Sequence, residues 1–251
     1  MTSTKPLAPR ATSLRNAFLD SALSSGSPAV ELTGVARRFG NRWVLKGASL
    51  VVSGAETVAL LGRNGSGKTT LLRIIATLLR PTRGSGTVFG HDLVRDTDAV
   101  RTHAGLLAHT NAVYPDLTAA ENLGFTVRML GRAFDQRSLE AALETVGLAA
   151  HANTRARGFS AGMQRRLALA RLRLIAPDVL LLDEPYSSLD PEGTELVTAL
   201  IADTRRNGGA TILVTHDISR ATRAADRVLS IDDGRIVPWS PSHMATGDDA
   251  E

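Results

Sequence analysis

The residues with the most specific chemistry lie in one segment, GRNGSGKTT, which runs from residue 62 to residue 70. It matches the pattern G-x-x-x-x-G-K-[ST] in full and stands between an expected strand and an expected helix, as that motif requires. Glycines let successive backbone N–H groups point at phosphate oxygens, and the positive end of the following helix faces the same anion. The segment therefore predicts a triphosphate site formed by Gly62, Arg63, Asn64, Gly65, Ser66, Gly67, Lys68, Thr69 and Thr70.

A second group of candidates follows the apolar run of VLLLDEP, at residues 179–185. The four apolar residues predict a buried strand, with Asp183 directly after them. Because ligands collect at the carboxyl ends of strands in open α/β sheets, we expect Asp183 and Thr69 to hold Mg²⁺. Lys68 would place its charge on the β- and γ-phosphates. Glu184 is the candidate for polarising an attacking water molecule.

A histidine completes this expected cluster. His216 follows another expected strand, at residues 211–215. A lone histidine at a strand end usually has a structural role, but its expected place at the same sheet edge as Asp183 favours contact with a γ-phosphate oxygen. His216 is therefore a catalytic candidate together with Glu184.

The stretch GFSAGMQRRLALARLRL, at residues 158–174, contains half of a further anion site. Ser160 is a good N-cap, and the following residues have the apolar spacing of a helix. The N-terminus of that helix, with Ser160 and Gly162 exposed, could bind phosphate. Because residues 62–70 already form a complete cradle, we expect this half site to serve a second copy of the chain. Two copies in two-fold symmetry would each close the other's nucleotide site.

Composition sets limits on the class of protein. The 251 residues are 43% hydrophobic, carry a formal net charge of +4 and contain no cysteine. A large core is possible, whereas disulfide and thiol chemistry are excluded. No window approaches the roughly 18 apolar residues of a membrane-spanning helix. Residues 1–28 are rich in Ser, Thr, Ala and Pro, and we expect them, like residues 238–251, to be a disordered tail.

The expected elements run from strands to helices and back to an alternation of both. Strands are expected at residues 30–35, 47–52, 56–61, 179–182 and 211–215, and helices at 68–79, 119–130, 137–146 and 191–206. The residues from about 92 to 175 are mainly helical by pattern. We therefore predict an α/β fold with a mostly parallel sheet core, an antiparallel β subdomain and a helical insertion.

Together these motifs resemble the ATPase subunit of an ATP-binding-cassette (ABC) transporter. The resemblance covers about residues 29–237, which we expect to form one ATPase domain of the P-loop type. It rests on Gly62–Thr69, Phe159–Gln164, Val179–Glu184, Ser187–Asp190 and His216. It implies that ATP and Mg²⁺ are bound and ATP is hydrolysed. It also implies separate transmembrane permease subunits, docked around residues 109–123, at the cytoplasmic face of the cell membrane.

The resemblance also implies roles for residues outside the phosphate loop. Ser160 and Gly162 would contact the γ-phosphate held by the opposite subunit of a homodimer. Phe39 would stack on adenine, and Asp190, in SSLD, would bind at the dimer seam. The family motif usually reads Leu-Ser-Gly-Gly-Gln, whereas this chain has FSAGM, and Met163 lacks the amide.

A second departure concerns the loop glutamine of the family. In GLLAHTNAVYP its place is taken by His109, which the resemblance makes a third catalytic candidate and whose charge would depend on pH. His109, LTAAENLGF, SAGMQRRLALARL and NGGATILVTH together resemble the ATPase of bacterial cytochrome c maturation, the haem-exporter subfamily. Cassettes that export drugs or lipids share most of these letters, so they are the alternative.

Two other functions are compatible with parts of the sequence. A soluble cassette protein acting on nucleic acid would use the arginines of residues 155–173, but such relatives usually carry two cassettes or long coiled-coil insertions. We expect these arginines to pair with acids or to cover a helix face, so no nucleic-acid partner is expected. A cassette that binds ATP without turnover is disfavoured by the intact Lys68, Asp183, Glu184 and His216.

Overall fold

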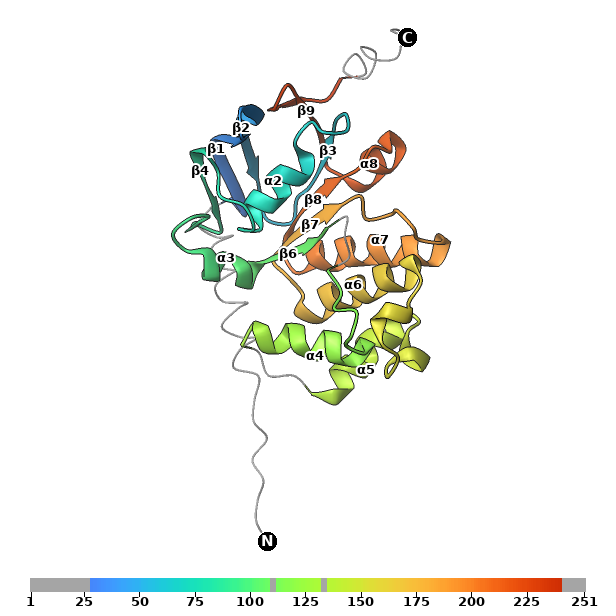
Figure 1. The fold of residues 1–251 in the computed structure, drawn as a ribbon. Helices are drawn as coiled ribbons and strands as arrows, with labels where there is room; N and C mark the ends of the chain where they lie inside the picture. The colour runs from blue at the N-terminus through green and yellow to red at the C-terminus, as the bar shows by residue number, and fades with distance from the viewer. Residues whose placement is uncertain (1–27, 109–111, 132–134, 241–251) are drawn as a thin grey trace.

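The computed structural model describes residues 28–108, 112–131 and 135–240, which fold around two β-sheets and a layer of helices (Figure 1). His109, residues 1–27 and residues 241–251 lie outside the described residues, so the expectations for His109 and for most of both tails are not addressed by the structure. Pro238, which we expected in the C-terminal tail, instead ends a strand.

The first sheet is antiparallel and contains the N-terminal part of the described chain. Its strand order is β2 (Arg42–Val52), β1 (Val30–Phe39), β4 (Arg83–Val88) and β5 (His91–Asp92). The first two strands form a hairpin that turns at Gly40 and Asn41, as expected, but both strands are longer than expected. Register shifts between Leu32 and Val35 and between Arg37 and Arg38 interrupt the pairing.

The second sheet is parallel except at one edge, and it carries the candidate site. Its order is β10 (Arg235–Pro238), β9 (Arg227–Asp232), β3 (Thr57–Leu61), β8 (Ala210–Val214), β7 (Val179–Asp183) and β6 (Ala104–Leu107). Every residue of β3, β7 and β8 is buried, as is typical of parallel strands covered on both faces. The carboxyl ends of these three strands meet at one sheet edge, where the predicted motifs begin.

Helices cover the second sheet on both faces (Figure 1). Helix α2 (Lys68–Ile75) packs between the two sheets and shares one hydrophobic cluster with them. Helices α6 (Ala161–Ile175) and α7 (Pro191–Arg206) cover the opposite face, and α4 (Ala119–Met129) and α5 (Gln136–Thr145) pack on α6. Helix α8 (Ile218–Ala224) packs against β3 and β9. In the described part of the chain, no helix is both long enough and apolar enough to cross a membrane.

The helical segment begins later than expected. Residues 91–107 contain β5, α3 (Thr97–His103) and β6, and β6 pairs in parallel with β7 as the edge strand of the core sheet. The expected helical region from about residue 92 is therefore wrong at its start, because the four residues of β6 are too short a run to show a strand period. Helix α2 also ends earlier than expected. Thr77 adopts φ 57°, and Leu78 N–H donates to Arg73 O in a Schellman-type end.

Candidate active site

The loop from Gly62 to Gly67 connects β3 to α2, and its glycines are required by both conformation and space. Gly62, Gly65 and Gly67 have φ of 146°, 76° and 112°. A Cβ on Gly67 would lie 2.8 Å from Cδ2 of Leu45, and one on Gly62 would lie 2.9 Å from the backbone oxygen of Ile231. The N-cap residue of α2 is Gly67, which has no side chain that could bond the free N–H groups of the helix. The positive end of α2 therefore faces the loop without a side-chain cap, as an anion site requires.

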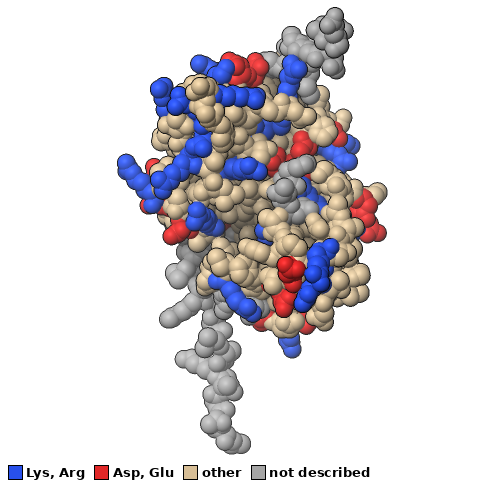
Figure 2. Space-filling view, in the orientation of Figure 1, with Lys and Arg blue, Asp and Glu red and all other residues tan. Residues whose placement is uncertain are grey.

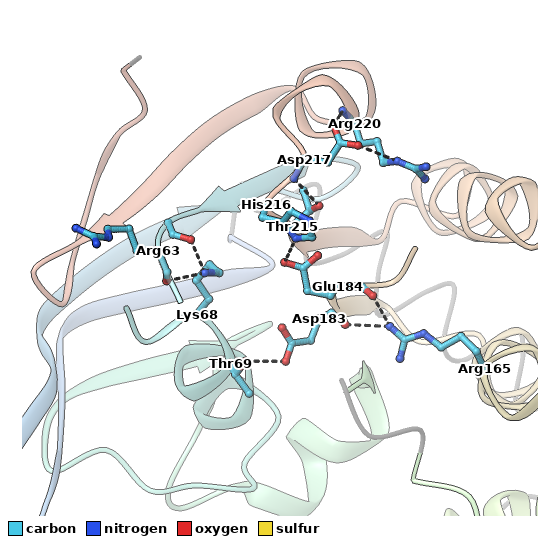
Figure 3. Close-up of polar contacts among 11 residues, drawn as sticks. Arg63, Lys68, Thr69, Arg165, Asp183, Glu184, Thr215, His216, Asp217 and Arg220 are labelled. Carbon is cyan, nitrogen blue, oxygen red and sulfur yellow. Dashed lines mark hydrogen bonds and ion pairs between the residues drawn. The ribbon is translucent and has the colours of Figure 1, made fainter. Parts of the chain in front are cut away.

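The side chain of Lys68 lies inside this loop (Figure 3). It is 8% exposed, and its Nζ donates to the backbone oxygens of Gly62 at 2.5 Å and Arg63 at 2.9 Å. Burial lowers the pKa of Lys68 from its ordinary value, and the negative charges of Glu184 and Asp183 oppose that shift. The ammonium group is thus held between the loop and the two strand-end carboxylates, where a triphosphate would add further negative charge.

Thr69 and Asp183 form the residue pair that is suited to a metal ion. The Thr69 hydroxyl donates to Oδ2 of Asp183 at 2.8 Å, and Asp183, the last residue of β7, is 3% exposed. Among the described residues, the buried Oγ of Ser66 has no hydrogen-bond partner, so a polar atom of the loop is available for a ligand. This donor set fits Mg²⁺, which prefers oxygen ligands and would supply charge neutralisation to phosphate when bound by Thr69 and Asp183.

Glu184 adopts an unusual backbone conformation beside Asp183. Its φ is 46°, which costs a non-glycine residue roughly 1–2 kcal/mol. Its N–H donates to the backbone oxygen of Val214, the last residue of β8, at 2.9 Å. Its Oε1 lies 3.1 Å from Nδ1 of His216, whose side chain is 80% exposed. The structure therefore places Glu184 and His216 at one sheet edge as expected, but His216 here contacts the carboxylate.

Sequence reasoning missed the residue behind this edge, Arg165 of α6. Its side chain is 1% exposed and donates to backbone oxygens of Asp183 (Nη2, 3.0 Å) and Glu184 (Nη2, 2.6 Å). It also donates to Ala108 O (Nη1, 2.6 Å) and Pro185 O (Nε, 3.4 Å). The sequence did contain an indication that Arg165 is buried. Its helical spacing places it on one face with Leu169 and Leu172, which are both buried.

One pocket of about 520 Å³ unites most of the predicted phosphate residues with the carboxylates. It is lined by Asn64, Gly65, Ser66, Gly67, Lys68, Thr69, Thr70, Asp183 and Glu184, together with Arg42 and Val44 of β2. Gly62 and Arg63 line a neighbouring pocket on the other side of the loop. Arg42 and Val44 were not predicted, because nothing in the local sequence indicates that the β1–β2 hairpin folds over the loop.

The Ser160 half site lies in a different pocket. A hollow of about 320 Å³ is lined by Ser160, Gly162 and Asp190, and it shares no lining residue with the phosphate pocket. Ser160 is exposed and caps α6 by accepting from Met163 N–H at 3.2 Å, as predicted. The half site is therefore well formed, but the chain does not bring it to its own phosphate loop.

The Asp190 carboxylate is already engaged within the chain. It caps α7 by accepting a hydrogen bond from Gly193 N–H at 2.8 Å, and it forms an ion pair with Nη2 of Arg166 at 2.7 Å. The Gly193 amide, and then Arg166, lower the pKa of Asp190. The structure thus shows a capping role for Asp190, whereas its predicted contact with nucleotide stays a prediction.

Phe39, the predicted adenine-stacking residue, ends β1 and is 46% exposed. The guanidinium of Arg37 lies over its ring, 4.6 Å from the centroid. Arg38 and Arg83 lie in the same way over Trp43, at 5.6 and 5.4 Å. Lys and Arg side chains gather on this end of the molecule, over the antiparallel sheet (Figure 2). Phe39 does not line the phosphate pocket but comes from the hairpin that supplies Arg42 to it.

Five of the six arginines of residues 155–173 fall into two groups. Arg157, Arg166 and Arg173 form ion pairs with acids, at 3.6, 2.7 and 3.2 Å, as expected. Arg165 and Arg171 are directed into the protein and donate to backbone oxygens; for Arg171 these are Leu106 O at 3.1 Å and Ala112 O at 3.3 Å. Burial lowers the pKa of both guanidinium groups. The expectation that these arginines pair with acids or cover a helix face did not include such contacts with backbone oxygens.

A glycine loop between a strand and a helix, with a buried lysine and strand-end carboxylates, defines a P-loop nucleotide-binding protein. Comparison with known proteins narrows the class. The family described as ABC transporter matches residues 45–187. The daunorubicin resistance ATP-binding protein DrrA3 of Streptomyces coeruleorubidus is 37% identical over 211 residues, which are 83% of this chain and 67% of that protein. The aliphatic sulfonates import ATP-binding protein SsuB 2 of Pseudomonas aeruginosa (strain UCBPP-PA14) is 39% identical over 218 residues, 85% of this chain and 75% of that protein.

Solved structures agree with this assignment. The ATP-binding subunit of an ABC transporter superposes with a TM-score of 0.77 at 25% identity, covering 83% of this chain and 88% of that chain. A dimeric ATP-binding cassette in a post-hydrolysis state, bound to ADP and Pi, superposes with a TM-score of 0.75 at 28% identity, covering 82% and 96%. The chain belongs to the ABC transporter family. It is an ATP-binding subunit with ATPase activity that uses ATP and Mg²⁺, and the predicted fold class is confirmed.

Proposed function

We propose that residues 29–237 form an ATPase domain that pairs with a second copy and drives separate membrane subunits. The observation that carries this proposal is the separation of the two phosphate-binding halves. Lys68 and Glu184 line one pocket, whereas Ser160 and Gly162 line another. In a two-fold dimer, the half site of each copy would close the phosphate loop of the other. The dimeric cassette among the structural relatives supports this arrangement.

Subunit complementation tests whether the two halves meet across a dimer. In Glu184→Gln the candidate base is lost. In Ser160→Asp the cap of α6 is retained, because Asp is an equally good N-cap, but its charge would repel the partner's triphosphate. We expect each variant alone to hydrolyse ATP at least about tenfold more slowly than wild type. A mixed dimer would contain one site with both changes and one intact site, so mixing should restore about a quarter of the wild-type rate.

The control for this experiment is Ser160→Asn, which keeps the cap and adds no charge. We expect Ser160→Asn to retain much more activity than Ser160→Asp. A mixture of Glu184→Gln and Ser160→Asp that stays as inactive as its components would contradict the composite site. Gel filtration of Glu184→Gln with ATP gives a second readout, in which a dimer is expected and a persistent monomer would count against the pairing.

Membrane attachment at the cytoplasmic face is part of the proposal. The transport path would lie on separate permease subunits, docked around residues 109–123. In the described part of that region, Tyr114 is 49% exposed and packs edge-on against Phe125, with ring centroids 4.8 Å apart. An exposed aromatic residue held in place by a neighbouring ring is suited to an interface. Tyr114→Glu should abolish co-purification with the permease and leave ATP binding intact.

We propose haem as the cargo, from the similarity of His109 and the flanking motifs to the ATPase of cytochrome c maturation. A drug cargo is the alternative, which the 37% identity to a daunorubicin resistance protein favours. Other relatives are named for the import of sulfonates, phosphate and methionine. Deletion of the gene should abolish c-type cytochromes if haem is the cargo. Normal cytochromes with increased sensitivity to daunorubicin would instead support the drug cargo.

A further inference from the structure

We propose that Arg165 is a positioning residue for hydrolysis: from α6 it holds the backbone turn that carries Glu184. The inference rests on the proposed role of Glu184 as the catalytic carboxylate. The side chain crosses from the helix that follows the Ser160 half site to the carboxyl end of β7 (Figure 3). Its guanidinium group donates to four backbone oxygens.

The backbone of Glu184 is held from two sides. Its N–H donates to Val214 O of β8 at 2.9 Å, and its C=O accepts from Nη2 of Arg165 at 2.6 Å. The same Nη2 donates to Asp183 O at 3.0 Å. Both peptide groups next to the Glu184 Cα are thereby fixed, one to the core sheet and both to α6. The direction of its side chain depends on this backbone, since φ and ψ determine where Cβ points.

The conformation of Glu184 needs such support. Its φ of 46° lies in the left-handed region, and the next residue is Pro185, which further restricts the residue before it. Without the two anchors, the turn would relax toward a commoner conformation and carry the carboxylate away from His216. Nε of Arg165 donates to Pro185 O at 3.4 Å, and Nη1 donates to Ala108 O at 2.6 Å. The same side chain therefore connects the turn to Ala108, the residue directly after β6.

An arginine is suited to this position because its planar group presents several donors in a fixed fork. A lysine would keep the positive charge and much of the apolar stem but would offer a single ammonium group. Arg165→Lys should therefore fold and still lose part of the array that fixes Glu184. We expect kcat for ATP to fall roughly 10- to 100-fold, as small misplacements of a catalytic group do. The affinity for ATP should stay within about twofold, because Arg165 does not line the phosphate pocket.

Arg171→Lys is the matched control. Arg171 lies on the same helix, is half-buried, and donates to Leu106 O and Ala112 O, but no bond joins it to the turn of residues 183–185 among those that the structure shows. Both substitutions should lower the melting temperature. Only Arg165→Lys should lower kcat by the stated factor. An equal loss of kcat in the two variants, or an unchanged kcat in Arg165→Lys, would overturn the proposal.

A double-variant experiment separates positioning from general damage. Single-turnover hydrolysis is measured in Glu184→Gln with and without Arg165→Lys. If Arg165 acts through Glu184, the second change should alter the residual rate by less than about twofold. A further drop as large as that in the wild-type background would show that Arg165 acts elsewhere. The proposed function fails separately, if Glu184→Gln by itself hydrolyses ATP at the wild-type rate.

Discussion

His216 Nδ1 lies 3.1 Å from Glu184 Oε1, and the two residues follow strands β8 and β7, which pair in parallel. The register that aligns Asp183 with Val214 brings Glu184, the residue after β7, and His216, two residues after β8, to the same edge. Glu184 thus has its backbone N–H bound to Val214 O of β8 and its carboxylate in contact with His216, just beyond that strand. In this structure His216 contacts the candidate base, and its predicted contact with phosphate stays a prediction.

His216→Ala should lower kcat more than it changes ATP affinity. The substitution removes the partner of the Glu184 carboxylate, and His216 does not line the pocket that contains Lys68. We expect kcat to fall roughly tenfold or more, because a general base acts only in the correct orientation. Steady-state kinetics give kcat and KM, and His91→Ala is the control, because His91 of β5 lines neither the phosphate pocket nor the Ser160 pocket. A large rise in KM at constant kcat would instead favour direct contact with the nucleotide.

Lys68→Ala should weaken ATP binding. The ammonium group lies inside the loop, and a hydrogen bond to a charged group contributes about 1.5–3 kcal/mol, which corresponds to roughly 10- to 100-fold in affinity. Titration with a fluorescent ATP analogue measures this change. Lys46→Ala is the matched control, since Lys46 forms an exposed ion pair with Asp233 outside the pocket. Unchanged binding in Lys68→Ala would remove the loop as the phosphate site.

Phe39→Ala should separate recognition of the base from recognition of the phosphates. Stacking of a base on an aromatic ring contributes about 1–3 kcal/mol, so ATP affinity should fall roughly 5- to 100-fold. The affinity for inorganic triphosphate should not change, because Phe39 does not line the phosphate pocket. Competition titration measures both ligands, and Phe39→Tyr should behave like wild type. Equal losses for ATP and triphosphate would show that Phe39 supports the fold of the hairpin instead.

Asp190→Asn should show a stability loss that disappears in acid. Asn can still cap α7, but it removes the charge that pairs with Arg166. The Gly193 amide and Arg166 hold the pKa of Asp190 below its ordinary value of 3.8, so the unfolded chain binds the proton more tightly than the folded one. The stabilisation by the charged form is therefore fully present above about 3.8 and is lost as pH falls through the lower folded-state pKa.

Melting temperatures of wild type and Asp190→Asn, measured by circular dichroism from neutral pH downward, test this pH dependence. The two curves should converge in acid. Asp116→Asn is the comparison, because Asp116 and Arg157 form an exposed pair at 3.6 Å. A difference between Asp190→Asn and wild type that persists unchanged at low pH would show that shape, and not charge, makes Asp190 stabilising.

Local patterns were enough to predict the pieces of the site. The glycines of residues 62–67 need φ that other residues avoid, and Lys68 follows at the start of a helix, so the loop can be recognised without its neighbours. The apolar residues before Asp183 and the helix cap at Ser160 can likewise be recognised from their neighbours along the chain. Strand β6 and the end of α2 were misjudged, because four residues show no period and because tertiary contacts decide where a short helix stops.

By itself the sequence determined the phosphate loop, the order of strands and helices around it, and the P-loop class, since each depends on neighbours along the chain. Only the tertiary structure decided that Arg165 is buried behind Glu184, that Arg42 reaches the phosphate pocket and that Ser160 lies in a separate one. Those relationships join residues on different elements, whose distances depend on sheet register and helix packing. No spacing along the chain encodes them directly.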